Sequence, residues 1–105
     1  MSISAHEVGP ALAAKLSFTR ERMSVTLIDG RVLSVPIDWY PRLKNATARE
    51  RSNWQLIGGG LGLYWPDVEE DISVDSLLAG RRSMESAKSF GKWLGARKGK
   101  TDRSA

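Results

Sequence analysis

Hydrophobic and polar residues alternate most clearly over residues 23–37. Residues 23–28 place an apolar side chain at every second position, which is the period of a strand with one buried face. Asp29-Gly30 follows, and this dipeptide favours the tight turn of a β-hairpin. Residues 31–37 form the returning strand, with Pro36 near its end because proline has no N–H to donate. The pattern predicts an antiparallel hairpin.

A second pair of apolar segments lies between residues 54 and 65. Residues 54–57 and 61–65 are predicted to be paired strands, and the proline after Trp65 ends the second one. The glycines at 58–60 resemble part of a nucleotide-binding loop. Such a loop opens a helix, however, and here another apolar run follows. A turn or bulge is therefore the preferred interpretation, and residues 16–18 add one more short strand.

Helix signals flank these strands. Residues 39–43 predict a helical turn. Thr47, with an acidic residue three positions later, has the capping-box pattern that begins a helix over residues 48–53. Residues 73–78 predict a further short helix, which Gly80 ends.

The chain divides into four predicted parts. Residues 1–15 are a lead and residues 16–81 a single α+β domain. Residues 82–97 are an amphipathic basic helix, with apolar residues every three or four positions from 83 on, and residues 98–105 are a disordered tail. The predicted fold is a small antiparallel sheet of four or five strands, with two or three helices packed on one face.

Composition narrows the class of protein. A chain of 105 residues and 11.6 kDa has room for one small domain. It contains no cysteine, which excludes disulfides and thiolate metal sites and fits the cytoplasm. Its apolar runs are too short to span a membrane, and its first residues lack the pattern of a signal peptide, so no membrane association is predicted.

Charge is distributed unevenly along the chain. Residues 1–76 hold 8 basic and 10 acidic residues, whereas residues 77–105 hold 8 basic and 2 acidic ones. The net charge of +4 therefore comes from the C-terminal quarter, and the part that folds is mildly acidic. A high overall pI does not by itself predict nucleic-acid binding by the domain.

The sequence offers no catalytic or metal-binding constellation. His6 is the only histidine and lies in the lead, so we expect it to be solvated. With no cysteine and no second histidine, a serine or threonine nucleophile would lack a base. The acidic cluster from Asp67 to Asp75 lacks the ligand spacing of a calcium loop. We predict a protein that is not an enzyme and holds no cofactor or metal.

Aromatic and acidic residues provide the first candidate for a binding surface. Five large aromatic residues lie in or beside the predicted strands, and most are expected in the core. Tyr64 and Trp65 are consecutive strand residues, so they point to opposite faces, and one faces the less buried side. The acids either cap the next helix and face solvent or dock a basic partner. The predicted partner-binding residues are Trp39, Tyr40, Arg42, Trp65, Glu69, Glu70 and Asp71.

The basic C-terminal segment provides a second candidate. Lys88 and Lys92 are four residues apart, so they share one face of the predicted helix. The segment is a solvated tail, a surface that docks on an acidic protein, or a contact for phosphate backbones whose affinity falls with salt. Under the last interpretation the nucleic-acid residues are Arg81, Arg82, Lys88, Lys92, Arg97 and Lys98.

Several of these motifs occur together in a known family. Asp29-Gly30-Arg31, residues 39–43, residues 53–60 and Trp65-Pro66 followed by residues 70–73 occur in the order that resembles the bacterial domain-of-unknown-function family 2442. The match covers Leu16 to Arg81. The resemblance implies an α+β domain with an antiparallel sheet, and it brings no catalytic residues with it. Some members carry a helix-turn-helix domain after this one, and none fits into the residues after Arg81.

The resemblance also implies a genetic setting. Such proteins look like members of two-gene bacterial cassettes, often beside a second small family of unknown function numbered 4160, and like antitoxins. We therefore predict a bacterial protein-interaction module that binds one partner stoichiometrically, with an antitoxin-like role as its specific form. Inhibition of a host system by a phage or mobile-element protein would need the same kind of surface. A small nucleic-acid-binding regulator that uses the basic segment is the alternative.

Overall fold

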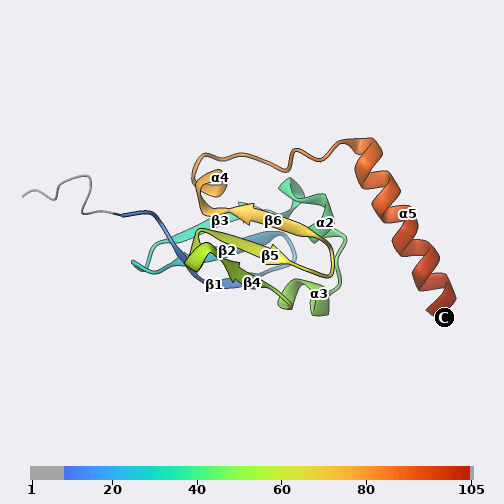
Figure 1. Ribbon diagram of the computed structural model, residues 1–105, viewed down its shortest axis with the longest axis horizontal. Helices are drawn as coiled ribbons and strands as arrows, with labels where there is room; N and C mark the ends of the chain where they lie inside the picture. Colours follow the sequence, from blue (N-terminus) through green and yellow to red (C-terminus); the bar gives the residue numbers. More distant parts are fainter. Residues whose placement is uncertain (1–8, 105) are drawn as a thin grey trace, which may run out of the picture.

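A computed structural model describes residues 9–104, and side chains are described for residues 9–97. His6 lies outside the described residues. No helix within them has the length and apolarity that crossing a bilayer requires. The fold is mixed α+β, as predicted (Figure 1). The elements in chain order are β1 (Ala13–Phe18), β2 (Arg22–Leu27), β3 (Val32–Pro36), η1 (Ile37–Trp39), α2 (Pro41–Lys44), α3 (Ala48–Ser52), β4 (Gln55–Ile57), η2 (Gly58–Gly60), β5 (Gly62–Trp65), β6 (Glu70–Ser73), α4 (Val74–Leu78) and α5 (Ala87–Ser104).

The strands form two antiparallel sheets of three strands each, in the orders β1-β2-β3 and β4-β5-β6. The prediction of one sheet of four or five strands was wrong on this point. The helical segment from η1 to α3 separates β3 from β4 and so divides the strands. The prediction also began β1 three residues too late and placed no strand at the position of β6.

The predicted hairpin of β2 and β3 is confirmed. Residues pair from Arg22 with Pro36 to Thr26 with Val32. At the turn, Gly30 adopts a positive φ of 95°, and the Arg31 N–H donates to the Asp29 side chain at 3.0 Å. The Asp29 side chain thus stabilises the turn.

The sheets enclose one core. Phe18 of the first sheet meets Trp65 of the second edge-to-face, with ring centroids 6.3 Å apart. Trp65 has no exposed surface, and its indole N–H donates to the Arg51 carbonyl at 3.1 Å, so its polar atom is satisfied. Among the described residues, all buried core side chains lie between Ala13 and Leu77.

The helix caps match the sequence signals. Thr47 and Glu50 form the predicted capping box at the start of α3. The Ser73 side chain accepts a hydrogen bond from the N–H of Ser76 and caps α4. The caps satisfy backbone N–H groups that a first helical turn leaves without partners.

The C-terminal helix differs from its prediction. α5 begins at Ala87, five residues later than expected, because the Ser86 hydroxyl and carbonyl accept hydrogen bonds from the first turn. It runs to Ser104 and so includes most of residues 98–105, for which disorder was predicted. Figure 1 shows α5 beside the domain, at the end where α2 and α3 lie.

The glycine turn η2 joins β4 to β5, so these glycines lead into a strand, as the turn interpretation predicted. Gly59 and Gly60 both have positive φ, at 68° and 110°. A Cβ at Gly60 would lie 2.8 Å from the Ala13 carbonyl oxygen, whereas one at Gly59 would meet nothing within 4 Å. Gly60 is therefore the point at which β1 approaches the second sheet.

We expect Gly60→Ala to lower the free energy of unfolding by about 3 kcal/mol, because it adds a backbone clash to an unfavourable φ. Gly59→Ala is the matched control and should cost only about 1 kcal/mol, since it meets the φ penalty alone. Urea unfolding followed by circular dichroism gives both values. Equal losses for the two variants would contradict the close contact with Ala13.

Candidate functional site

A groove of about 440 Å³ runs between β6 and the linker that joins α4 to α5. We call it the charged groove. Seven of the residues predicted for the two candidate surfaces contribute to its walls. The lining residues are Tyr40, Arg42, Glu69, Glu70, Asp71, Ile72, Ser73, Ser76, Arg81, Arg82, Ser83, Met84, Glu85 and Ser89.

Arg42 is the centre of the polar contacts in the groove. Its guanidinium donates to both carboxylate oxygens of Glu85, with the shortest N···O distance at 2.6 Å, and to the Val68 carbonyl at 3.0 Å. The two side chains are only 18% and 11% exposed. Hydrogen bonding between them raises the pKa of Arg42 and lowers that of Glu85. Arg42 is thus already paired within the chain.

Glu70 is the acidic residue of the groove whose pKa is shifted most. It pairs with Trp65 in the β5–β6 ladder and is half-buried. The pKa of Glu70 is raised to about 7, chiefly by burial; the charge of Arg42 lowers it, and the nearby Glu85 and Asp71 carboxylates raise it. Glu70 therefore changes its charge near neutral pH.

The outer wall of the groove is acidic. Glu69 and Asp71 are exposed on either side of Glu70. Glu69 adopts a φ of 52°, which is unusual for a residue with a side chain, at the end of the turn between β5 and β6. Opposite them lie Arg81 and Arg82 on the linker, so the two walls carry opposite charges.

The aromatic part of the predicted surface needs correction. Trp65 is 0% exposed and cannot contact a partner, because its side chain lies on the face of β5 that packs into the core. Tyr40 is 3% exposed, and its hydroxyl donates to the Arg81 carbonyl at 3.0 Å. Burial and the charge of Glu70 raise the pKa of Tyr40. Trp39 is half-buried, and the Arg82 guanidinium lies 5.3 Å from its ring centroid.

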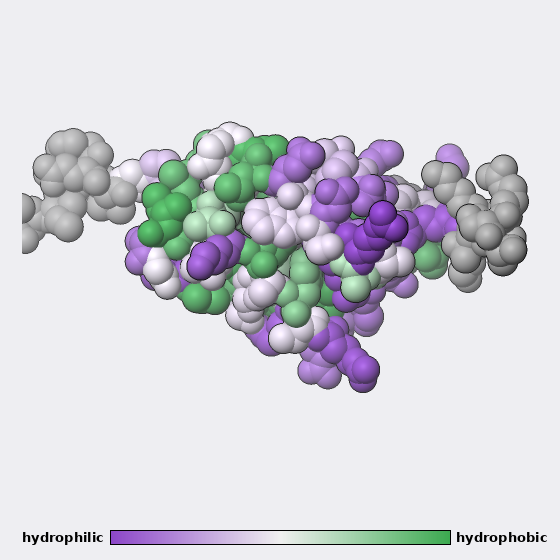
Figure 2. Space-filling model, turned by 90° about the horizontal axis from the view of Figure 1, so that it is seen from below, coloured by the Kyte–Doolittle hydropathy of each residue, from purple (hydrophilic) through white to green (hydrophobic). Residues whose placement is uncertain are grey.

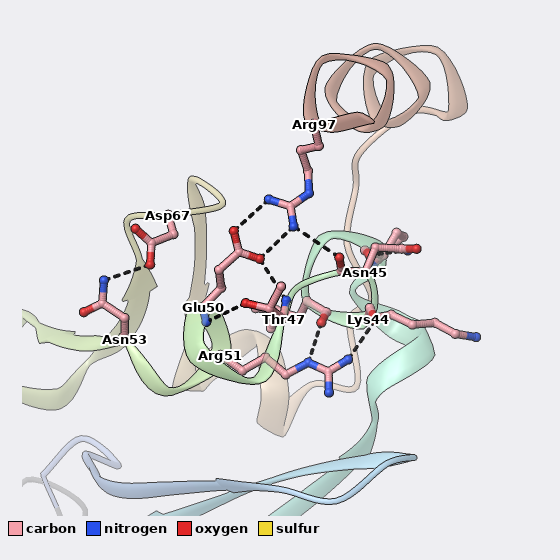
Figure 3. A network of polar contacts seen from close by, with 10 residues as sticks. Lys44, Asn45, Thr47, Glu50, Arg51, Asn53, Asp67 and Arg97 are labelled. Carbon is pink, nitrogen blue, oxygen red and sulfur yellow. Dashed lines mark hydrogen bonds and ion pairs between the residues drawn. The ribbon is translucent and has the colours of Figure 1, made fainter. Parts of the chain in front are cut away.

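The predicted nucleic-acid residues do not form one patch. Arg81 and Arg82 line the charged groove, whereas Lys88 and Lys92 are exposed on α5. Arg97 reaches from α5 to Glu50, with its nearest N···O distance at 2.7 Å (Figure 3). The side chain of Lys98 lies outside the described residues.

Sequence reasoning missed Glu85 and Ser89. The Ser89 hydroxyl donates to the Glu85 carboxylate at 2.8 Å and helps to hold it against Arg42. The only sequence signal was the isolation of Glu85, which is the single acid between residues 77 and 97. Its pairing with Arg42, 43 positions away, depends on tertiary structure.

The surface of the domain is divided by polarity. Figure 2 shows apolar residues gathered at the end where the N-terminal segment leaves, and polar ones toward α5. Exposed apolar side chains include Ile28, Val32, Ile57 and Leu61. The charged groove, in contrast to these apolar side chains, offers acidic and basic side chains that can bind charged groups, and its Glu70 can take up a proton. Within the described residues, no three histidine, cysteine or acidic side chains lie close enough to hold a metal ion.

Comparison with known proteins supports the resemblance seen in the sequence. Residues 13–83 match the family described as "Protein of unknown function (DUF2442)". The chain belongs to this family. The match covers the stretch from Leu16 to Arg81 on which the resemblance rested, and no curated protein matches the chain.

Two solved structures share the DUF2442 chain's fold. A crystal structure of a protein of unknown function from Rhodospirillum rubrum is 26% identical, with a TM-score of 0.63, over 73% of this chain and 95% of that one. The solution structure of an uncharacterized protein from Chromobacterium violaceum is also 26% identical, with a TM-score of 0.60, over 77% and 74%. Neither description names an activity.

The raised pKa of Glu70 predicts a pH-dependent stability. The folded state holds the Glu70 proton more tightly than the unfolded state, so its contribution is fully present below pH 4.5 and is lost as pH rises through about 7. Because water reaches this half-buried carboxyl, we expect a loss of about 1–2 kcal/mol, less than the whole shift would give. Glu70→Gln should remove this loss.

Urea unfolding at several pH values between 5 and 8 measures the effect. Glu21→Gln, at an exposed acid outside the charged groove, is the control and should keep the wild-type slope. A wild-type stability that stays constant or rises over this range, with the same profile for Glu70→Gln, would contradict the assignment.

Proposed function

We propose that this DUF2442 chain is a non-catalytic protein-interaction module that binds its partner at the charged groove. The observation that carries the proposal is the outward-facing acidic wall, where Glu69 and Asp71 are exposed while the nearby Arg42 is already paired with Glu85. The wall therefore presents negative charge that the chain itself leaves open to solvent. Such a surface attracts and orients a partner with basic side chains.

The side chains at the floor of the groove already have hydrogen-bond partners within the chain, and this also favours binding over catalysis. Tyr40 donates to the Arg81 carbonyl and Arg42 to the Val68 carbonyl, and these two bonds hold the floor of the groove and the turn before the acidic wall in place. Within the described residues, no buried side-chain nitrogen or oxygen lacks a hydrogen-bond partner. A pre-formed surface of this kind loses little entropy when a partner binds.

We further propose an antitoxin-like role in a bacterial two-gene cassette, with the partner encoded by the neighbouring gene and met in the cytoplasm. The setting is the one that the resemblance to the family implies, and the acidic wall supports the chemistry. The mechanism would be stoichiometric occlusion, in which the module covers a basic surface of the partner.

Co-purification with the product of the neighbouring gene tests this function. We expect a stable complex, and we expect the double variant Glu69→Lys/Asp71→Lys to weaken it at least about tenfold, because like charges then face each other. Calorimetry measures the affinities. Glu21→Lys is the control, since this exposed acid is outside the charged groove, and it should bind as the wild type does.

Two outcomes would contradict the proposal. One is the failure of two folded proteins to form any complex. The other is equal weakening by the groove variant and by the control, which would show a general charge effect rather than a docking surface.

Nucleic-acid binding is the second candidate, because Lys88 and Lys92 are exposed on one side of α5 while Trp93 and Arg97 contact the body. If α5 binds a phosphate backbone, Lys88→Glu/Lys92→Glu should reduce the affinity for duplex DNA and the slope of its salt dependence by about two charges. Fluorescence anisotropy at several salt concentrations measures both. Unchanged binding, or none in the wild type, would exclude this role.

A further inference from the structure

α5 is attached to the domain with little apolar packing. Trp93 is the one α5 side chain among the partly buried residues that pack against the core, and no described α5 residue belongs to the buried core itself. The polar contacts of α5 and its preceding linker residue Glu85 with the body include two ion pairs, Glu85 with Arg42 and Arg97 with Glu50, and a hydrogen bond from Arg97 to the Asn45 carbonyl. The helix is therefore held mainly by electrostatic contacts.

These contacts meet around one ring. The guanidinium of Arg42 lies 5.2 Å from the centroid of the Trp93 ring, and that of Arg97 lies 4.6 Å from it. Phe90 stacks on the same ring at 5.8 Å. Cations favour the face of an indole, so the two ion pairs and the ring stabilise one another. Loss of either pair loosens the other.

The body side of this attachment comes from α2 and α3. Arg42 lies in α2, and Glu50 lies in α3, where it also closes the capping box with Thr47. Figure 3 shows Arg97 reaching down from α5 to Glu50 and to the carbonyl of Asn45. Both sheets are thus complete without α5.

The linker is hydrogen-bonded to the body on the N-terminal side of Met84. The Ser83 N–H donates to the Trp39 carbonyl at 3.0 Å, and Tyr40 holds the Arg81 carbonyl. Met84 follows with 94% of its surface exposed, and α5 begins at Ala87. A movement of α5 therefore has its hinge near Met84 and leaves Arg81 and Arg82 in place.

We propose that residues 84–97 form a strap that alternates between a docked form, in which Glu85 occupies Arg42, and a released form, in which Arg42 and the adjacent end of the charged groove are open. Release moves Met84, Glu85 and Ser89 away from the groove that they line. When the basic surface of the partner meets the acidic wall, one carboxylate beside that surface takes the place of Glu85 on Arg42. This last consequence rests on the proposed function, whereas the movement itself does not.

Salt and single substitutions act directly on this equilibrium. The charge pairs of the strap are 11–22% exposed, so water and ions reach them. Raising the ionic strength to about 1 M shortens the screening length to about 3 Å and weakens them. Glu85→Gln and Arg97→Gln each remove one pair, and neither residue belongs to a core that the fold needs.

The chain contains no cysteine, so two introduced cysteines can carry spin labels at chosen positions only. Gly95→Cys on α5 and Gln55→Cys on β4 are exposed and outside the strap contacts, and a Cβ at Gly95 meets nothing within 4 Å. The distribution of distances between the labels, measured by pulsed electron resonance, reports docking. In the labelled parent at low salt we expect one narrow distance, with a released population of about 0.1–10%.

The double variant Glu85→Gln/Arg97→Gln should convert most molecules to a broad distribution of distances, and about 1 M salt should increase the released fraction in the parent. Asp38→Asn is the matched control, because it removes an exposed ion pair with Lys44 that does not involve the strap, and it should leave the narrow distance unchanged. Circular dichroism checks that the body remains folded.

A narrow distance that persists in the double variant, or in the parent from low salt to about 1 M, would overturn the strap. These results do not depend on any partner. If the strap is released as expected and yet no complex forms with the neighbouring gene product, the proposed function fails and the strap stands.

Discussion

The Arg42 guanidinium holds together three segments that are far apart in the sequence. It donates to the Val68 carbonyl in the turn before β6, pairs with Glu85 in the linker, and lies against the Trp93 ring of α5. These contacts define one end of the charged groove and the position of the C-terminal helix. A buried or half-buried arginine requires such a set of partners, because leaving its charge unpaired would be costly.

The chemistry of the groove follows from this arrangement. Burial has the largest effect on the pKa of Glu70 and raises it; the charge of Arg42 lowers this pKa, and the carboxylates of Glu85 and Asp71 raise it. Glu70 therefore holds its proton to about pH 7 while Glu69 and Asp71 stay exposed beside it. The groove thus combines a fixed negative rim with one group that responds to neutral pH, which suits recognition of charge.

Local sequence signals predicted the local structure well. Asp29-Gly30 identified a hairpin, Thr47 with Glu50 a capping box, and the three glycines a turn, because each of these depends on residues close together in the chain. The separation into two sheets was not predictable in the same way. It depends on where β1 meets the second sheet, at Gly60, and no spacing of apolar residues encodes that contact.

The candidate site was only partly predictable for the same reason. The acidic residues at 69–71 and the arginines at 81–82 do meet in one groove, but Trp65 and Tyr40 are in the core. Alternation along β5 showed that Tyr64 and Trp65 face opposite ways without showing which face is buried. Glu85, the partner of Arg42, is 43 residues away in the sequence, and no local pattern predicts a contact over that separation.

Packing around the Arg42–Glu85 pair buries Glu70, and this burial outweighs the attraction between Glu70 and the Arg42 charge. Titration of the Glu70 side-chain carboxyl by carbon-13 NMR tests this most directly. The structure predicts a midpoint near pH 7 in the intact chain. A midpoint near the ordinary glutamate value of about 4.3 would show that the carboxyl is open to water or paired with a cation, and would contradict the account.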